Sequence, residues 1–297
     1  MVSDRIEALH APLSVIGGNE VYPELLKLGP VVIRSYGVML ALSFFVGVLL
    51  IRHRARRSGV DPDFVVSLSF VVIIAGVIGA RLFYAFYHWS DFSGNVLDIF
   101  NPFGSSEGFG IAGLNMQGGV ILAIVCALIY TRIRKQSIPA VFDLFAPAIG
   151  LGVCLTRIGC FLNGCCFGTE CHLPWAVHFP HGSIPYSYLG DVPVHPAQLY
   201  SSLYGLILFL VLSYVEKRKR YLGLTFSLFL MIEAFFRYLI EYVRFYESQM
   251  HLSLFGVDLT YNHVVAILMF LAGVVLLILA RRKNIKPFRL SAVSKAA

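Results

Sequence analysis

The sequence has little charge: Asp, Glu, Lys and Arg together make up only 14% of its 297 residues. Soluble domains carry roughly 25% charged residues, so this shortage excludes an ordinary soluble protein. Hydrophobic residues take their place, at 57% of the chain, and the mean hydropathy is +0.74. This composition predicts a polytopic membrane protein.

The sequence also lacks segments that would indicate other classes. Its first 30 residues contain no basic start followed by an apolar run and a small-residue cleavage site, so we expect no cleavable signal peptide. It has no low-complexity tract and no convincing internal repeat. Residues 1–32 are instead mixed and partly polar, and we predict an arm at the membrane surface there.

Seven apolar segments follow the arm, each close to the roughly 20 residues that a helix needs to cross a bilayer. They are residues 34–51, 64–87, 110–131, 140–162, 196–215, 222–244 and 259–280. We therefore predict an all-α polytopic membrane protein with about seven transmembrane helices. After the arm, the transmembrane domain would cover 33–283, with an external loop near 163–195, and a basic tail would cover 284–297.

Positive charge is confined to alternate loops between these segments. Most Lys and Arg residues follow the first, third, fifth and seventh segments: Arg52, Arg54, Arg56, Arg57; Arg132, Arg134, Lys135; Lys217, Arg218, Lys219, Arg220; Arg281, Arg282, Lys283, Lys286, Arg289 and Lys295. The positive-inside rule then places the N-terminus outside and the C-terminus in the cytoplasm. The net charge of +7 reflects this topology and contact with anionic lipid, so we expect no nucleic-acid partner.

Polar side chains gather near the predicted outer ends of six segments. An arginine at such a depth costs several kcal/mol unless it is paired or hydrated, so Arg157 is a functional candidate. A planar guanidinium group binds two phosphate oxygens at once, so several arginines at one depth indicate a phosphate-bearing ligand. We predict one site near the outer leaflet, formed among Tyr36, Arg81, Gln117, Gly118, Gly119, Arg157, His195, Gln198, Tyr200, Arg237 and Arg244.

The sixth segment carries alternating charges at Glu233, Arg237, Glu241 and Arg244. Their spacing places them on one helix face, where they must pair and face protein or water. Two interpretations remain open. The charges form a ladder that only fixes helix packing, or Glu residues on both sides of Arg237 aim its guanidinium at a ligand.

Cysteines cluster near the same depth, at Cys160, Cys165, Cys166 and Cys171. Their spacing is unlike that of zinc sites, and neighbouring cysteines seldom both bind one ion, so we expect no metal. A disulfide in an oxidising compartment fits better, and a catalytic thiol stays open. We predict that one pair is oxidised or close enough to be. His195 begins the fifth segment, where it serves either as a capping residue or as a neutral base.

Several motifs, in this order, resemble the prolipoprotein diacylglyceryl transferases of bacterial plasma membranes. The resemblance covers about residues 22–280. Its most specific motifs are Arg-Ile-Gly-Cys-Phe-Leu-Asn-Gly-Cys-Cys-Phe-Gly over 157–168 and His-Pro-Ala-Gln-Leu-Tyr over 195–200. Shorter matches include Ile-Arg-Ser-Tyr-Gly-Val-Met over 33–39, Gly-Ala-Arg-Leu-Phe-Tyr over 79–84 and Arg-Tyr-Leu-Ile-Glu-Tyr-Val-Arg over 237–244.

The resemblance implies an enzyme of the bacterial inner membrane that needs no cofactor. It would transfer the diacylglyceryl group of phosphatidylglycerol to the lipobox cysteine of a preprolipoprotein, releasing glycerol phosphate. Arg157 would bind the lipid phosphate, Arg237 would be the second essential arginine, and Tyr36 and His195 would be the remaining catalytic candidates. Asn163 and Gly168 would line the headgroup pocket. The wider substrate-binding set would be Arg81, Gln117, Gly118, Gly119, Gln198, Tyr200, Glu241 and Arg244.

The sequence departs from the family pattern at four positions. Gln117, Cys160, Glu233 and Ser201 stand where the family often has His, Asn, Tyr and Glu. These departures keep open a family member that binds lipid or assists assembly without transferase activity. A lipid or small-anion transporter is a further alternative, which predicts a polar path through to the cytoplasmic ends of the segments. Those ends are apolar except at Asp143.

Overall fold

The computed structural model describes residues 21, 23–28, 31–92, 99, 115–246, 251–254 and 257–286, and this part is mostly helical. Its helices are α1 (Ser35–Ser58), α2 (Pro62–Tyr87), α3 (Trp89–Phe92), α4 (Met116–Ile133), α5 (Ile138–Asn163), α6 (Ile184–Leu189), α7 (Ala197–Arg218), α8 (Leu224–Ile240) and α9 (Tyr261–Lys283). Two antiparallel hairpins join them, β1 (Glu24–Leu28) with β2 (Val31–Arg34) and β3 (His251–Leu254) with β4 (Val257–Thr260). Most of the predicted arm and tail lies outside the described residues.

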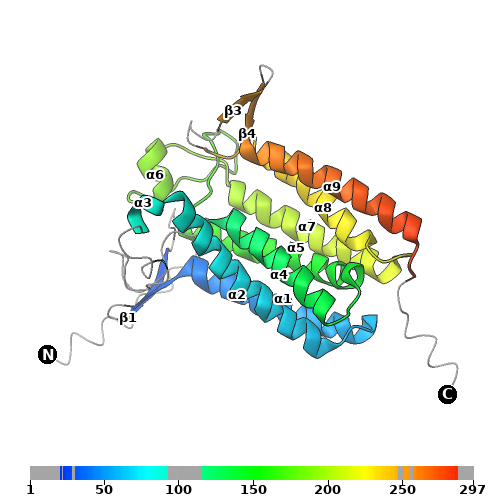
Figure 1. The fold of residues 1–297 in the computed structure, drawn as a ribbon. Helices are drawn as coiled ribbons and strands as arrows, with labels where there is room; N and C mark the ends of the chain where they lie inside the picture. The colour runs from blue at the N-terminus through cyan, green and yellow to red at the C-terminus, as the bar shows by residue number, and fades with distance from the viewer. Residues whose placement is uncertain are drawn as a thin grey trace.

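Every predicted apolar segment contains a helix of the bundle. Six of these helices, α1, α2, α4, α5, α7 and α9, are long and apolar enough to cross a membrane. The remaining helix, α8, has 17 residues and packs along α9. In Figure 1 the long helices run side by side, with α3, α6 and both hairpins at one end. The chain is an all-α polytopic membrane protein; the count of seven crossings stays a prediction.

Side-chain caps explain where several of these helices begin. At the start of α2, the Asp61 carboxylate accepts a hydrogen bond from the Asp63 N–H at 2.9 Å. Asn115 caps α4 in the same way, through its side-chain oxygen. Thr260 and His263 form a reciprocal capping box at the start of α9. Each cap satisfies backbone N–H groups that the first turn leaves without an acceptor.

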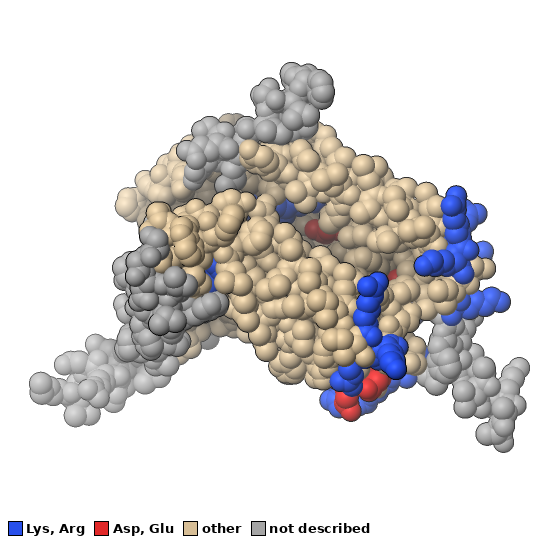
Figure 2. Space-filling model, viewed as in Figure 1, with Lys and Arg blue, Asp and Glu red and all other residues tan. Residues whose placement is uncertain are grey.

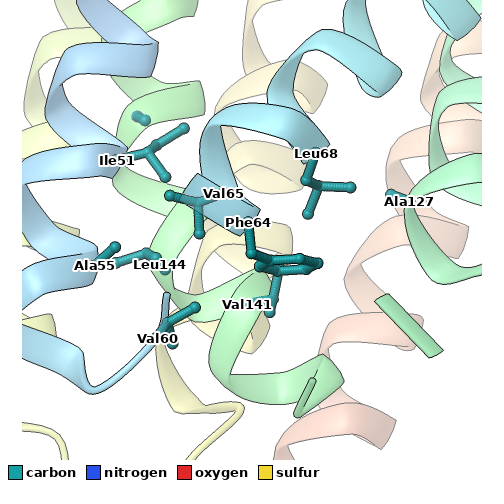
Figure 3. Packing of buried hydrophobic residues seen from close by; sticks show 10 residues of the cluster. Ile51, Ala55, Val60, Phe64, Val65, Leu68, Ala127, Val141 and Leu144 are labelled. Carbon is teal, nitrogen blue, oxygen red and sulfur yellow. The ribbon is translucent and has the colours of Figure 1, made fainter. Parts of the chain in front are cut away.

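The largest apolar core lies where α1, α2, α4 and α5 meet, at the end of the bundle that carries the loop between α1 and α2. Figure 3 shows its buried side chains, among them Ile51, Ala55, Val60, Phe64, Val65, Leu68, Ala127, Val141 and Leu144. Phe64 also stacks on Tyr130, with ring centroids 5.6 Å apart. This core holds the helices together at the end away from the hairpins.

Glycines bring α2 and α4 into close contact. A Cβ on Gly118 would lie 2.2 Å from the Cβ of Phe83 and 2.5 Å from the Gly79 carbonyl oxygen. A Cβ on Gly119 would lie 2.8 Å from the Gly76 carbonyl oxygen. Close approach through small residues is how helices associate in lipid. The structure therefore gives Gly118 and Gly119 a packing role; substrate binding by them stays a prediction.

Charge is distributed along the bundle as the loop pattern predicts. Figure 2 shows Lys and Arg gathered at the end opposite the hairpins, with a broad uncharged band between. The described residues of the four basic clusters lie in the last turns of α1, α4, α7 and α9 or just after them, and these helices all end there. In the middle of this band, a recess exposes a few acidic and basic atoms to view.

This charge distribution leads to a topology prediction. A reporter fused after Lys283 is expected to be cytoplasmic, and one inserted near Gly182 is expected to be external, because the basic clusters resist translocation. Paired alkaline phosphatase and fluorescent protein fusions measure this. The opposite result at both positions would reverse the orientation, and with it the assignment of the hairpin end to the outer leaflet.

Asp143 interrupts the otherwise apolar cytoplasmic ends predicted for the segments. It belongs to a buried network at the basic end of the bundle. Its carboxylate lies 3.1 Å from the Lys219 ammonium, and it accepts the N–H groups of Gly223 at 2.8 Å and Phe226 at 2.9 Å. Glu216 holds Lys219 from the other side at 2.9 Å. Asp143 thereby ties α5 to the start of α8. Its contacts are those of a helix junction, so it gives no support to a transport path.

Candidate functional site

Arg157 lies near the end of α5, at the hairpin end of the bundle. Here α1 crosses α5 closely: a Cβ on Gly159 would lie 2.8 Å from the Met39 Cβ and 3.4 Å from the Tyr36 Cα. The crossing places Tyr36 within electrostatic range of Arg157. No described residue forms a hydrogen bond or ion pair with the Arg157 guanidinium. A half-buried cation without a protein partner is suited to bind an anionic ligand.

Arg237 is held by a buried carboxylate. Its Nε lies 3.2 Å from Glu241, whose side chain is fully buried. Glu241 also accepts hydrogen bonds from the Tyr246 hydroxyl at 2.9 Å, the Thr260 hydroxyl at 3.2 Å and the Asn262 amide at 3.3 Å. Burial raises the pKa of Tyr246 to about 12, so its hydroxyl keeps the proton that it donates. These contacts aim Arg237 and leave its terminal nitrogens without a partner among the described side chains.

The prediction that Arg244 continues the charged face of α8 is wrong. The helix ends at Ile240, and Arg244 pairs with Gly168 in an isolated antiparallel bridge. The next residue, Phe245, donates its N–H to the Phe167 carbonyl at 3.1 Å. This pairing gives hydrogen-bond partners to backbone groups that would otherwise have bonded within a further turn of α8. The Nε of Arg244 is buried without a hydrogen-bond partner in the described structure.

Glu233 does not pair with Arg237 as the helical spacing suggested. Its Oε1 accepts a hydrogen bond from the Tyr204 hydroxyl at 3.2 Å, and its Oε2 is buried without a partner among the described residues. Both side chains lie within electrostatic range of Arg157 and Arg237. Tyr204 was missed in the sequence. The signal available in the sequence was a second tyrosine four residues after Tyr200, because residues four apart lie on the same face of a helix.

Gly168 lies where the loop after α5 crosses two other segments. Its N–H donates to the His195 carbonyl at 3.1 Å. A Cβ at this position would lie 2.5 Å from both the Cβ and the carbonyl oxygen of His195, and 2.7 Å from the Val243 carbonyl oxygen. Only glycine permits this approach. Gly168 therefore positions the loop, and its contact with a headgroup stays a prediction.

Gly168→Ala is expected to lower the free energy of unfolding by about 1–3 kcal/mol, because the methyl group must displace backbone on two sides. Thermal unfolding in detergent measures the change. Gly47→Ala is the control, since a Cβ on Gly47 meets no atom within 4 Å. Equal melting temperatures for the two variants would contradict the packing role.

His195 is engaged by other side chains before the start of α7. Its Nδ1 lies 3.3 Å from the Tyr200 hydroxyl, which accepts a hydrogen bond from the Trp175 indole at 2.7 Å. Because an indole can only donate, the Tyr200 oxygen accepts from Trp175, and its O–H remains available to donate to Nδ1. The N-cap of α7 is Pro196, so His195 precedes the cap. This geometry favours a positioning role for His195 over that of a free base.

Two further predicted residues hold loops in place. The fully buried Gln198 donates its amide to the Cys165 carbonyl at 2.9 Å. The Nε of Arg81 donates to the Ile99 carbonyl, and its guanidinium lies 5.0 Å from the ring centroid of Phe92. Both side chains therefore donate to the protein backbone, and the Gln198 Oε1 is buried without a hydrogen-bond partner among the described residues. Their predicted contact with substrate stays a prediction.

Gln117 and Asn163 lie at helix ends. The exposed Gln117 is in the first turn of α4, where its N–H donates to the Asn115 side chain at 3.0 Å. Asn163 is the last residue of α5, before a left-handed Gly164 with φ 71°. Neither side chain forms a hydrogen bond with Arg157 or Arg237 in the part that the structure describes. Asn163 shares a helix with Arg157, whereas α4 packs mainly on α2.

All six cysteines are free thiols, so the predicted disulfide is not formed. The prediction that a pair is close enough to be oxidised is confirmed for three of the four clustered cysteines. The sulfurs of Cys160, Cys165 and Cys166 all lie within 4.8 Å of one another but are not bonded. Such a cluster could hold a thiophilic metal ion. It lies within electrostatic range of Arg157, which interacts with Cys160 and Cys166.

Comparison with known proteins identifies the family. The profile of the family described as prolipoprotein diacylglyceryl transferase matches residues 23–279. A Geobacter sulfurreducens protein named phosphatidylglycerol–prolipoprotein diacylglyceryl transferase is 32% identical over 269 residues, covering 89% of this chain and 97% of the relative. Proteins of the same name from Aliivibrio fischeri and Vibrio cholerae are 33% and 31% identical, covering 89% and 91% of this chain and 91% and 95% of their own lengths. Because these matches cover most of its length, this chain belongs to the prolipoprotein diacylglyceryl transferase family.

Proposed function

We propose that the protein transfers the diacylglyceryl group of phosphatidylglycerol to the cysteine thiol of a prolipoprotein. The observation that carries this proposal is the Arg157 guanidinium, which lies at the hairpin end and has no described protein partner. Arg157 and Arg237 both lie within electrostatic range of the Tyr204–Glu233 pair. The names of the relatives supply the two substrates.

The charge of the site matches a phosphodiester. Arg157, Arg237 and Arg244 bring three positive charges, and Glu233 and Glu241 bring two negative ones when ionised. The surplus is a single positive charge, which equals the charge on one phosphatidylglycerol phosphate with opposite sign. Glu241 takes only the Nε of Arg237, so the terminal nitrogens can bind two phosphate oxygens at once.

The reaction follows from this placement. The thiol sulfur attacks the glyceryl carbon that bears the phosphate, forming a C–S bond while the C–O bond breaks and glycerol phosphate leaves. Arg157 and Arg237 stabilise the negative charge that develops on the departing phosphate. Tyr36 lies within electrostatic range of Arg157 and, as a protonated phenol, can donate a hydrogen bond to the departing phosphate. The thiol proton leaves with the glycerol phosphate, whose newly freed oxygen accepts it. His195 instead holds Tyr200 in place.

We place this site near the outer leaflet of the bacterial plasma membrane. The hairpin end lies opposite the basic clusters, which the positive-inside rule assigns to the cytoplasm. The recess in the uncharged flank of Figure 2 exposes charged atoms within the apolar band, where a lipid headgroup could enter from the side. The lipobox signal peptide would approach the same site from the membrane.

Transfer of a labelled diacylglyceryl group from phosphatidylglycerol to a lipobox peptide, by the purified protein in detergent, tests the proposal. A peptide with serine in place of the acceptor cysteine is the control. Rescue of cells depleted of their own transferase is the matching test in vivo. Lipid binding without transfer, together with no rescue, would instead favour a lipid-binding or assembly role.

Gln117→His is expected to keep transfer activity within about tenfold, a change of at most ~1.4 kcal/mol. An amide does not titrate near neutral pH, so Gln117 contributes at most hydrogen bonds, which the imidazole can replace. The exposed position of Gln117 at the start of α4 leaves room for the ring. The ratio kcat/KM in the same assay measures the effect. Complete loss of turnover would show that the Gln117 amide has a role that imidazole cannot fill.

A further inference from the structure

The three clustered thiols are held in place by the fold. Cys160 belongs to the last turn of α5, and Cys165 and Cys166 follow the turn at Gly164. The Cys165 N–H and thiol both donate to the Cys160 carbonyl, at 3.1 Å and 3.7 Å, and Gln198 donates to the Cys165 carbonyl. Contacts from α5 and α7 therefore fix the loop that carries the sulfurs.

The backbone at Cys166 is unusual. Its φ is +61°, in the left-handed region that residues other than glycine seldom adopt. Such a conformation persists only where the surroundings impose it, and it is a reason to look for function. Here the consequence is that two neighbouring cysteines both direct their sulfur atoms toward Cys160.

The electrostatic environment distinguishes the three thiols. Hydrogen bonds with Cys160 and Cys165 lower the pKa of the Cys166 thiol, Arg244 and Arg157 act in the same direction, and burial opposes them. Hydrogen bonds with Cys160 and Cys166 raise the pKa of the Cys165 thiol. Of the two loop thiols, Cys166 therefore gives up its proton more readily than Cys165, and the thiolate is the form that reacts with disulfides.

We propose that Cys160 and Cys166 form a thiol–disulfide exchange site, with Cys166 as the attacking sulfur and Cys160 as the resolving sulfur. A bond between Cys165 and Cys166 is disfavoured, because neighbouring Cα atoms are about 3.8 Å apart whereas disulfides usually span 4.4–6.8 Å. The reacting partner is a disulfide-bearing oxidant. This inference does not depend on transferase activity.

The exchange runs in two steps. The Cys166 thiolate attacks one sulfur of the oxidant's disulfide, forming a mixed disulfide and releasing the other sulfur as a thiolate. Cys160 then passes its proton to the thiolate released in the first step and attacks the Cys166 sulfur, which releases the second thiolate and leaves a Cys160–Cys166 bond. Two electrons pass from the protein to the oxidant.

A metal site and covalent catalysis fit the cluster less well. A metal ion would need both neighbouring cysteines as ligands, and the nearby positive charges of Arg157 and Arg244 oppose the binding of a cation. A diacylglyceryl group placed on Cys166 would form a thioether, whose sulfur is a poor leaving group for onward transfer. Disulfide exchange uses the same thiolate without either difficulty.

The test treats the reduced, desalted full chain in detergent with oxidised glutathione, alkylates the remaining thiols and maps the peptides by mass. We expect a Cys160–Cys166 disulfide and no bound glutathione. Cys160→Ser should trap glutathione on Cys166, because the resolving sulfur is missing. Cys166→Ser should slow the reaction with glutathione disulfide at least about tenfold. Cys171→Ser, in the same external segment but outside the cluster, should behave like the unchanged protein.

Three outcomes would overturn the proposal. The first is a folded wild-type protein whose three thiols all stay reduced. The second is glutathione found on Cys171 in place of Cys166 in the Cys160→Ser variant. The third is a bound zinc ion, released by acid from the reduced protein, that protects all three thiols from alkylation.

Discussion

Arg157→Lys is expected to lower diacylglyceryl transfer by about two to three orders of magnitude, or ~3–4 kcal/mol, comparable to the loss of one preorganised donor. Lysine keeps the positive charge but cannot hold two phosphate oxygens in the planar geometry of a guanidinium. No described residue pairs with Arg157, so the substitution breaks no ion pair in the protein and the variant should fold normally. The transfer assay with a lipobox peptide measures the loss.

Arg157→Ala should lose more activity than Arg157→Lys. The matched control is Arg54→Lys, on α1 near the basic end, where Arg54 donates to the Ser213 hydroxyl at 2.7 Å. It should leave transfer unchanged, because it lies at the opposite end of the bundle from Arg157. Near-normal turnover of Arg157→Lys would show that the reaction needs only the positive charge of Arg157. Unfolding of both Arg157 variants would show that Arg157 is needed for folding, and the phosphate site would then be assigned to Arg237.

Asp143→Ala is expected to lower the free energy of unfolding by about 3 kcal/mol, the low end of the cost of breaking a buried ion pair. The substitution leaves the buried Lys219 ammonium with Glu216 as its remaining partner. It also removes the acceptor of the Gly223 and Phe226 N–H groups at the start of α8. Thermal or denaturant unfolding in detergent measures the change.

Two variants give this prediction its controls. The two N–H groups donate to different oxygens of Asp143. Asp143→Asn keeps an acceptor for one of them and loses the other acceptor and the charge, so its cost should be smaller than that of Asp143→Ala. Asp63→Ala, on the exposed first turn of α2, should change stability by no more than about 0.5 kcal/mol. Transfer per folded molecule should be unaffected in all three variants. A stable Asp143→Ala protein that lost transfer would connect the network to the reaction and contradict its structural role.

The helices could be predicted because in lipid every backbone polar group must be satisfied within the segment. Apolar length alone then indicates a helix. All seven segments contain one, from α1 to α9, and the basic loops lie together at one end as their alternation required. Motif order was equally informative, since it identified the family and named Arg157 and Arg237 before any geometry was known.

Side-chain partners could not be predicted from spacing. The regular intervals in the sixth segment placed Glu233 beside Arg237, yet Glu233 pairs with Tyr204 on another helix. Arg244 left the helix because its backbone neighbours found partners in the loop after α5. Both outcomes depend on which groups other segments bring within 3–4 Å, and a linear pattern does not contain that information.

The sequence by itself determined the helical membrane fold, the charge asymmetry of its two ends and the family, because these depend on composition, length and motif order. The tertiary structure alone decided which of the polar candidates are held by contacts within the protein and which are left without a partner among the described residues. Gly118, Gly168 and Gln198 proved to hold helices and loops, whereas Arg157 kept a guanidinium without a described partner. The physical reason is that a buried polar group takes the nearest available partner, and only the folded chain establishes which group that is.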